Sequence, residues 1–194
     1  MSPRSRIGWQ PGVLPDGCRH AAALVLIYPI EGRSHLLLTQ RRHNLAEHGG
    51  QVSLPGGEVD AEESNVQAAL RETEEEVGVS RKHVEVVGKL TPLHIPVSRF
   101  ILHPIVGHAG QRPAVTPSEN EVARVIEPSL ASLASPSNWS HKRSEGPGAP
   151  SEVPFFAVDD LEVWGATAMV LAELLTLLNV TVDPWRADAD HFVG

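Results

Sequence analysis

The segment from residue 57 to residue 79 constrains the fold more than any other part of this 194-residue chain. It reads GEVDAEESNVQAALRETEEEVGV and places many carboxylates around a single arginine, Arg71. Such a cluster is costly in a folded protein unless a cation neutralises it, and a hard divalent cation with oxygen ligands is the simplest choice. The segment therefore predicts a loop and a helix that together surround a cation site.

Local signals predict where this helix begins and ends. Ser64 and Gln67 form a capping box at its start, although Asp60 and Glu63 offer a second, overlapping box. Gly78 occupies the position at which a helix commonly ends in the left-handed conformation. Side chains at helical spacing form the inward-facing stripe, which comprises Val66, Ala69, Leu70, Thr73 and Val77.

Three glutamates share another face of the same helix. Glu72, Glu75 and Glu76 are three and four residues apart, so their side chains are neighbours. They repel one another at neutral pH, and near the helix C-terminus they also oppose the helix dipole. An acidic face open to solvent is the alternative, as in an ordinary Glu-rich helix. The fixed offsets from the loop glycines and Glu63 favour a metal site over that alternative.

The segment resembles the Nudix box, the signature of hydrolases that act on nucleoside diphosphates linked to another moiety. Every fixed position matches except Thr73, where the family usually has an aliphatic residue. Because threonine is isosteric with valine, we expect only a modest effect on packing. The resemblance implies an α/β fold, namely the Nudix α/β/α sandwich with a mixed β-sheet between helices.

The resemblance also implies roles for individual residues. It places Mg²⁺ or Mn²⁺ at Glu72, Glu75 and Glu76, with Gly56 and Glu63 as further metal-binding residues. Glu63 pairs with Arg71 if it does not bind metal. Arg71 is expected to hold the glutamates by charge-assisted hydrogen bonds. The residues expected to take part in catalysis are Arg71, Glu72, Glu75, Glu76 and Glu121.

The stretch before this segment adds positive charge and turns. Arg41, Arg42 and His43 put positive or titratable groups beside an otherwise acidic site, as a polyphosphate ligand requires. Glycine pairs at 49–50 and 56–57 allow the backbone to approach a phosphate or a metal closely. Surface charge after a strand is the alternative interpretation of the two arginines.

This stretch resembles the second signature of the coenzyme A diphosphatase branch of the family. The matching residues are Leu37, Leu38, Thr39, Arg41, Gly50, Pro55, Gly56 and Gly57. Arg42, Ala46 and Leu54 depart from it, and Ala46 matters most because it replaces a cation that could contact phosphate. The residues expected to bind substrate are Arg41, Arg42, His43, Gly50, Gln51 and Ser53. Residues 98–107 and 164–168 also resemble this branch.

Composition and charge agree with an enzyme acting on a small anion. The net charge of −8 argues against a nucleic-acid partner, whereas bound Mg²⁺ would invert the local sign for a small nucleotide. The single cysteine, Cys18, suits a reducing cytoplasm. The N-terminus lacks a signal pattern, and the longest apolar stretch, 21–30, is too short to span a bilayer. We expect a cytoplasmic protein without a membrane partner, and a homodimer is compatible with the fold.

The length suits one Nudix domain, at residues 21–182, between an irregular arm at 1–20 and a tail at 183–194. Strands are predicted at 21–28, 35–39, 84–90, 100–106 and 122–126, with a hairpin turn at 31–33. Loops are predicted at 109–120 and 135–154, and an apolar helix at 162–180.

The implied activity is metal-dependent hydrolysis of the pyrophosphate bond of coenzyme A or a derivative, giving 3′,5′-ADP and 4′-phosphopantetheine. A box glutamate or Glu121 is the candidate general base. Three alternatives stay open. The first is a Nudix diphosphatase that acts on ADP-ribose, a dinucleotide or an oxidised nucleotide. The second is a non-catalytic nucleotide sensor, and the third is a plain acidic metal-binding protein. The intact glutamates disfavour the second, and the glycine pairs disfavour the third.

Overall fold

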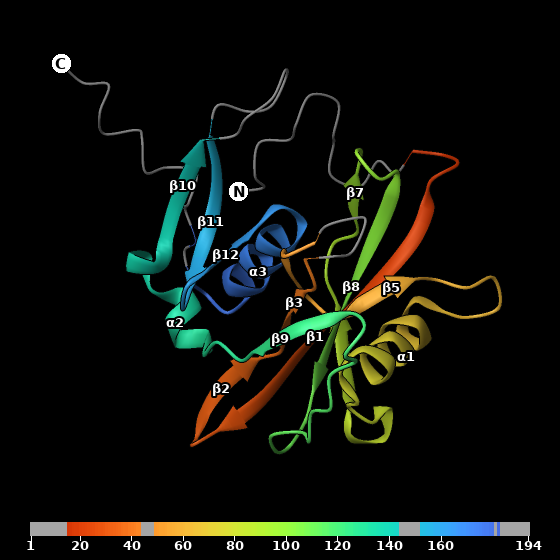
Figure 1. Ribbon diagram of the computed structural model, residues 1–194, viewed down its shortest axis with the longest axis horizontal. Helices are drawn as coiled ribbons and strands as arrows, with labels where there is room; N and C mark the ends of the chain where they lie inside the picture. Colours follow the sequence, from red (N-terminus) through yellow and green to blue (C-terminus); the bar gives the residue numbers. More distant parts are fainter. Residues whose placement is uncertain (1–14, 44–48, 144–151, 181, 183–194) are drawn as a thin grey trace.

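A computed structural model describes residues 15–43, 49–143, 152–180 and 182 (Figure 1). Its central strand, β1 (Arg19–Ile30), has a hydrophobic core on each face. Ala22, Leu24 and Leu26 belong to one core, while Ala23 and Val25 belong to the other. Successive strand residues point to opposite faces, so a strand covered on both sides must be an uninterrupted apolar run.

The largest sheet has six strands and is mixed, as predicted. Its order is β2 (Arg33–Leu36), β1, β8 (Phe100–His108) and β6 (Glu85–Lys89). Two short strands extend it, because β5 (Gly56–Glu58) pairs with β1 and β7 (Leu93–Ile95) pairs with β8. The β1–β8 pair is parallel, and the other pairs are antiparallel.

Two antiparallel three-stranded sheets complete the strand layers. One contains β4 (Val52–Ser53), β3 (Leu38–Arg41) and β9 (Val122–Ile126), in that order. The other contains β10 (Trp139–Arg143), β11 (Glu152–Val158) and β12 (Leu161–Trp164).

Helices cover both sides of the central sheet, which confirms the predicted α/β class. The helix α1 (Asn65–Val77) packs against β1, β5 and β8, and its apolar side chains share a core with Leu24 and Leu26. The helix α3 (Gly165–Leu177) contributes to the opposite core and packs against β11 and β12 (Figure 1). The remaining helices are short: α2 (Leu130–Ala134), η1 (Arg81–His83) and η2 (Pro136–Asn138). Within the described ranges, none of the helices has the length and apolar character needed to cross a membrane.

The caps of α1 are those predicted from the sequence. The amide of Gln67 donates to Ser64 Oγ at 3.3 Å, and the Gln67 side chain accepts from the Ser64 amide at 2.8 Å. Gly78 ends the helix with φ 71°. Thr73 is 1% exposed, and its hydroxyl donates to the carbonyl oxygen of Ala69 at 2.7 Å. The polar atom at this usually aliphatic position is therefore satisfied inside the helix.

The predicted hairpin is present, but its second strand is divided between two sheets. Ile30 pairs with Arg33 across a two-residue turn in which both residues have positive φ. The strand predicted at 35–39 ends as β2 at Leu36 and resumes as β3 at Leu38. Leu37 lies between them and packs into the α1 core, so the chain passes here from the central sheet to the β3 sheet.

Three predictions were wrong at element boundaries. The loop predicted at 135–154 contains β10 and the start of β11, because the antiparallel pairing of these two successive strands overrides its polar composition. The helix predicted at 162–180 begins later, since Val163 lies in β12 and pairs with Phe156. Arg19 and His20, assigned to the irregular arm, belong to β1. Residues 1–14 of that arm, the tail at 183–194 and Ala46 lie outside the described residues.

Candidate active site

Arg71 lies at the centre of an acidic cluster formed by α1 and the loop before it. Its guanidinium donates to both carboxylate oxygens of Glu63, at 2.6 and 3.1 Å, and to Glu72 Oε1 at 2.7 Å. It also donates to Glu75 Oε2 at 3.1 Å, and Asp60 Oδ2 lies 3.9 Å away. Four carboxylates therefore surround one guanidinium, and the cluster carries excess negative charge.

The three helix glutamates differ sharply in burial. The exposed fraction of the side chain is 60% for Glu75, 20% for Glu72 and 6% for Glu76. Burial raises the pKa of Glu76 to about 7, although the nearby Arg41 guanidinium and the Gly56 amide lower it. Burial also raises the pKa of Glu72 above its usual value, against the effect of Arg71. Burial thus disfavours the charged forms of half-buried Glu72 and buried Glu76, and their protein partners only partly offset this.

The Gly56–Gly57 turn brings the backbone directly against these carboxylates. The Gly56 amide donates to Glu76 Oε2 at 3.3 Å. A Cβ atom on Gly57 would lie 2.4 Å from the carboxyl carbon of Glu72, which is far inside contact distance. Glycine is needed here for space, because the Glu72 carboxylate occupies the position of the missing side chain.

The chemistry of these donors fits a hard divalent cation. The carboxylates of Glu72 and Glu76 offer oxygen ligands, as Mg²⁺ and Mn²⁺ prefer. Across the described parts of the chain, no three His, Cys, Asp or Glu side chains are already grouped as ligands of one ion. Glu72 and Glu75 instead contact Arg71, while the Glu76 carboxylate accepts from the Gly56 amide at 3.3 Å and lies 3.7 Å from the Arg41 guanidinium.

The β3–β4 hairpin joins the upstream residues to this cluster. Arg41 Nη1 lies 3.7 Å from Glu76 Oε1, and its buried Nε has no hydrogen-bond partner among the described residues. The Arg41 amide donates to the Gln51 carbonyl at 2.9 Å, and the Gly50 amide donates to the Arg41 carbonyl at 3.0 Å. His43 packs over Gly50, where an added Cβ would lie 2.6 Å from the imidazole ring. The hairpin thereby places Arg41 beside the most buried glutamate.

Two other residues predicted to bind substrate, Arg42 and Ser53, make their recorded contacts away from the glutamates. Arg42 turns away from the glutamates, because its Nη1 donates to the Glu119 carbonyl at 2.5 Å. Its amide donates to the Glu121 carbonyl at 3.0 Å. Ser53 is half-buried, with its Oγ 3.3 Å from the hydroxyl of Thr39.

Glu121 lies close enough to the helix glutamates for its carboxylate to affect their pKa values. Its carboxylate is one of the groups that raise the pKa of both Glu72 and Glu76. Its own amide donates to the Ser118 carbonyl at 3.2 Å, and the residue is exposed. The structure thus brings Glu121 to the same site as Arg41 and the two buried glutamates.

Sequence reasoning missed the backbone contacts that cover the C-terminal end of α1. The amide of Thr116 donates to the Val77 carbonyl and the amide of Ser118 donates to the Glu76 carbonyl, each at 2.8 Å. These bonds satisfy carbonyls that a helix C-terminus leaves without partners. Backbone amides carry no residue-type signal, and Pro117 between them indicates only a turn.

A glutamate-bearing helix that packs on one face of a mixed sheet, behind a Gly-Gly turn, defines a known class of protein. Residues 19–144 match the family model of the NUDIX domain. The chain therefore belongs to the Nudix family, whose members are hydrolases of phosphorus anhydrides that generally use Mg²⁺ or Mn²⁺ and act on small nucleotides.

The names of similar proteins agree with the family and do not specify a substrate. The chain is 34% identical over 171 residues to the uncharacterized Nudix hydrolase NudL of Photorhabdus laumondii, with 88% of this chain and 90% of that protein covered. It is 37% identical over 175 residues to the protein of the same name from Shigella flexneri, with coverage of 89% and 90%. Among solved structures, the Nudix hydrolase RenU of M. smegmatis is similar, with a TM-score of 0.61 at 20% identity and coverage of 83% and 86%. That likeness shows the fold alone.

Proposed function

We propose that the protein hydrolyses the pyrophosphate bond of coenzyme A or its derivatives, giving 3′,5′-ADP and 4′-phosphopantetheine. The contact between Arg41 and Glu76, at 3.7 Å, carries this proposal. It joins the hairpin that resembles the coenzyme A signature to the helix that resembles the Nudix box. One site then offers carboxylates for a cation and, beside them, a guanidinium for the phosphates of the substrate.

In this proposal Glu72, Glu75 and Glu76 hold Mg²⁺ or Mn²⁺, with Gly56 as a further ligand. Of the two roles expected for Glu63, the pairing with Arg71 is the one its contacts favour, since both of its carboxylate oxygens accept from that guanidinium. A bound divalent cation neutralises charge on a diphosphate and lowers the pKa of water. Arg71 supplies the counter-charge that keeps neighbouring carboxylates together, through its bonds to Glu63, Glu72 and Glu75. The burial of Glu76 keeps bulk water away from the most enclosed of the three carboxylates.

The substrate is proposed to lie against the hairpin that carries Arg41, His43, Gly50, Gln51 and Ser53. Arg41 has its guanidinium at the site and is the best placed of these residues to contact a phosphate oxygen. Arg42 contributes differently, because its bonds to the carbonyls of Glu119 and Glu121 hold the backbone that precedes β9.

Glu121 is our candidate for the general base. It lies near Glu72 and Glu76 and is exposed, so its carboxylate can receive a proton from water at the site. A Glu121→Gln variant should lose roughly a hundredfold in kcat. Glu119→Gln is the matched control, since only the backbone carbonyl of Glu119 contacts Arg42. Equal turnover in both variants would remove Glu121 from this role.

The proposed function is tested by comparing kcat/KM for five substrates with Mg²⁺ and with Mn²⁺. Coenzyme A, ADP-ribose, NADH, diadenosine polyphosphate and 8-oxo-dGTP cover the alternatives. Glu76→Gln is the inactive control, and Glu74→Gln is the matched active control because Glu74 pairs with Arg81 away from the site. We expect coenzyme A to lead by roughly tenfold and to yield 3′,5′-ADP.

Two other outcomes would reject this specificity. If a different substrate leads, the protein is a Nudix diphosphatase for that class, and the resemblance of the hairpin to the coenzyme A signature is not predictive. If no substrate is turned over while nucleotide and metal still bind, the protein is a nucleotide sensor.

A further inference from the structure

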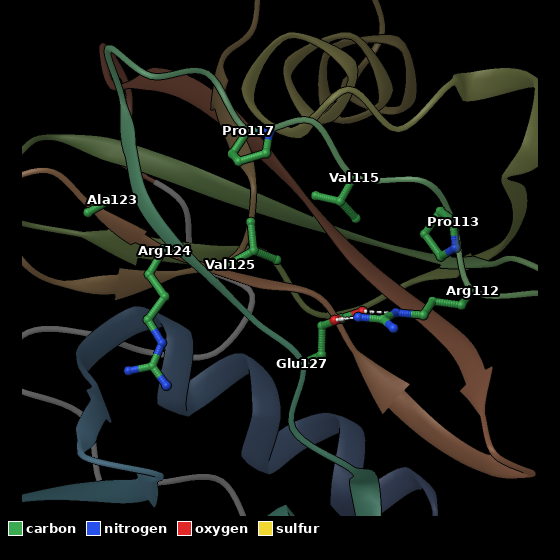
Figure 2. A pocket seen from close by; sticks show the side chains of 8 residues that line it. All are labelled: Arg112, Pro113, Val115, Pro117, Ala123, Arg124, Val125 and Glu127. Carbon is green, nitrogen blue, oxygen red and sulfur yellow. Dashed lines mark hydrogen bonds and ion pairs between the residues drawn. The ribbon is translucent and has the colours of Figure 1, made fainter.

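Glu127 links three separate parts of the chain through one carboxylate. The hydroxyl of Tyr28, in the central strand, donates to Glu127 Oε1 at 2.7 Å, and Tyr28 is 1% exposed. Arg112 Nε donates to the same oxygen at 3.1 Å, while Arg112 Nη2 contacts Oε2. Glu127 itself directly follows β9. Figure 2 shows the Arg112 side chain of the loop and the Glu127 side chain just after β9 reaching toward each other.

The loop that carries Arg112 connects β8 to β9 and reaches the proposed active site. Its middle part caps α1 through the amides of Thr116 and Ser118. Its last part leads to Glu121, whose amide bonds to Ser118 and whose carbonyl accepts from Arg42. A displacement of this loop would therefore move Glu121 and would release the carbonyl of Glu76.

An open pocket separates this loop from β9 near the ion pair. The pocket has a volume of about 520 Å³. Figure 2 shows the side chains that line it, which are Arg112, Pro113, Val115 and Pro117 on the loop side and Ala123, Arg124, Val125 and Glu127 on the side of β9. Val115 of the loop and Val125 of β9 are partly buried against the α1 core. At the Arg112 end of the pocket, the ion pair with Glu127 is the contact that ties the loop to the end of β9.

The charge at Glu127 is maintained by its partners. Burial raises the pKa of Glu127, but hydrogen bonds from Arg112 and Tyr28 outweigh burial and leave the pKa below its usual value. Burial and the bond to Glu127 raise the pKa of Tyr28, so the phenol keeps the proton that it donates. Both oxygens of the Glu127 carboxylate therefore accept hydrogen bonds, Oε1 from Tyr28 and Arg112 and Oε2 from Arg112.

We infer that Glu127, held between Tyr28 and Arg112, is a positioning residue that fixes the β8–β9 loop and, through it, Glu121 and the C-terminal turn of α1. Its effect on turnover rests on the proposed function. Its effect on the loop does not, because the contacts lie wholly within the protein.

The experiment replaces the arginine, because Arg112→Met leaves the buried Tyr28–Glu127 bond in place. The matched control is Arg124→Met, since Arg124 is an exposed arginine of the same pocket that pairs with Asp159 and Asp160 instead. Amide hydrogen exchange of Thr116 and Ser118 is measured by NMR in the metal-free protein. We expect exchange to accelerate roughly fivefold in Arg112→Met and to remain at the wild-type rate in Arg124→Met.

Kinetics provide the second readout. Arg112→Met should lower kcat by roughly fivefold with little change in KM, and Arg112→Lys should restore part of the loss by keeping one charged donor. Glu127→Gln should reproduce the faster exchange. Unchanged exchange in Arg112→Met, or equal changes in Arg112→Met and Arg124→Met, would overturn the inference. If the wild type turns over no substrate, the proposed function fails, and the exchange data still decide the role of Glu127.

Discussion

Two clusters of charged side chains, one around Arg71 in α1 and one around Arg112 in the β8–β9 loop, differ in their balance of charge. Arg71 has four carboxylates within 4 Å, and the buried Glu76 lies next to this group. Arg112 has one carboxylate partner, Glu127, which also accepts a hydrogen bond from the hydroxyl of Tyr28.

The difference separates a ligand site from a structural tie. The Arg112 cluster is neutral, because one guanidinium faces one carboxylate, so it needs no added cation. The Arg71 cluster is negative, and burial raises the pKa of its member Glu72 and of the adjoining Glu76, so an added cation would stabilise both carboxylates. An ion pair in a fold therefore indicates a metal site only where carboxylates outnumber the cations of the protein.

The largest effect is expected at Glu72. Glu72→Gln removes charge from the unbalanced cluster and should lower kcat by roughly a thousandfold. Glu74→Gln, on the same helix but paired with Arg81, should stay within roughly twofold of the wild type. Steady-state kinetics with Mg²⁺ measure both variants. Similar losses in the two would show that negative charge on α1 matters generally, rather than at the Arg71 cluster.

A smaller effect is expected from a change that removes no charge. Gly57→Ala places a methyl group 2.4 Å from the Glu72 carboxyl carbon, so that carboxylate must move. We expect kcat to fall between roughly tenfold and a hundredfold. Gly88→Ala is the matched control because a Cβ there meets no atom within 4 Å. Full activity in Gly57→Ala would mean that the position of Glu72 is not critical.

The smallest effect is expected at the Arg112 cluster, where pH should change the free energy of unfolding. Because the folded pKa of Glu127 is lowered, its ionised form stabilises the fold above the usual glutamate value of about 4.5, and this contribution is lost as pH falls below that value. Wild type should exceed Glu127→Gln by about 1 kcal/mol in the free energy of unfolding at pH 7. Urea titrations at several pH values should show the difference shrinking toward pH 3. A constant difference would mean that charge at Glu127 contributes nothing.

Local signals predicted the parts of the structure that depend on neighbouring residues. The capping box at Ser64, the end at Gly78 and the central apolar strand need only short-range information, and all are present. Strand β10 was missed because its WSHKR sequence is polar, and its pairing depends on β11. The start of α3 was misplaced because Val163 fits the helical spacing although it lies in a strand.

The candidate site shows the same division. The cluster around Arg71 follows from spacing along one helix and its loop, and the contacts with Glu63, Glu72 and Glu75 are local. The partners of Arg42 and Arg112 lie in other strands and loops, so no local pattern indicates them. Residue type shows that a charge is present, whereas the fold decides which group it meets.

Isothermal titration of Mn²⁺ into the metal-free protein tests the central claim most directly, because it needs no knowledge of the substrate. The wild type, Glu76→Gln and Glu74→Gln are compared under identical conditions. We predict that wild type and Glu74→Gln bind equally and that Glu76→Gln binds at least roughly tenfold more weakly. Equal affinity in Glu76→Gln, or no binding by the wild type, would contradict the assignment of the metal site to Glu76 and the adjoining glutamates of the Arg71 cluster.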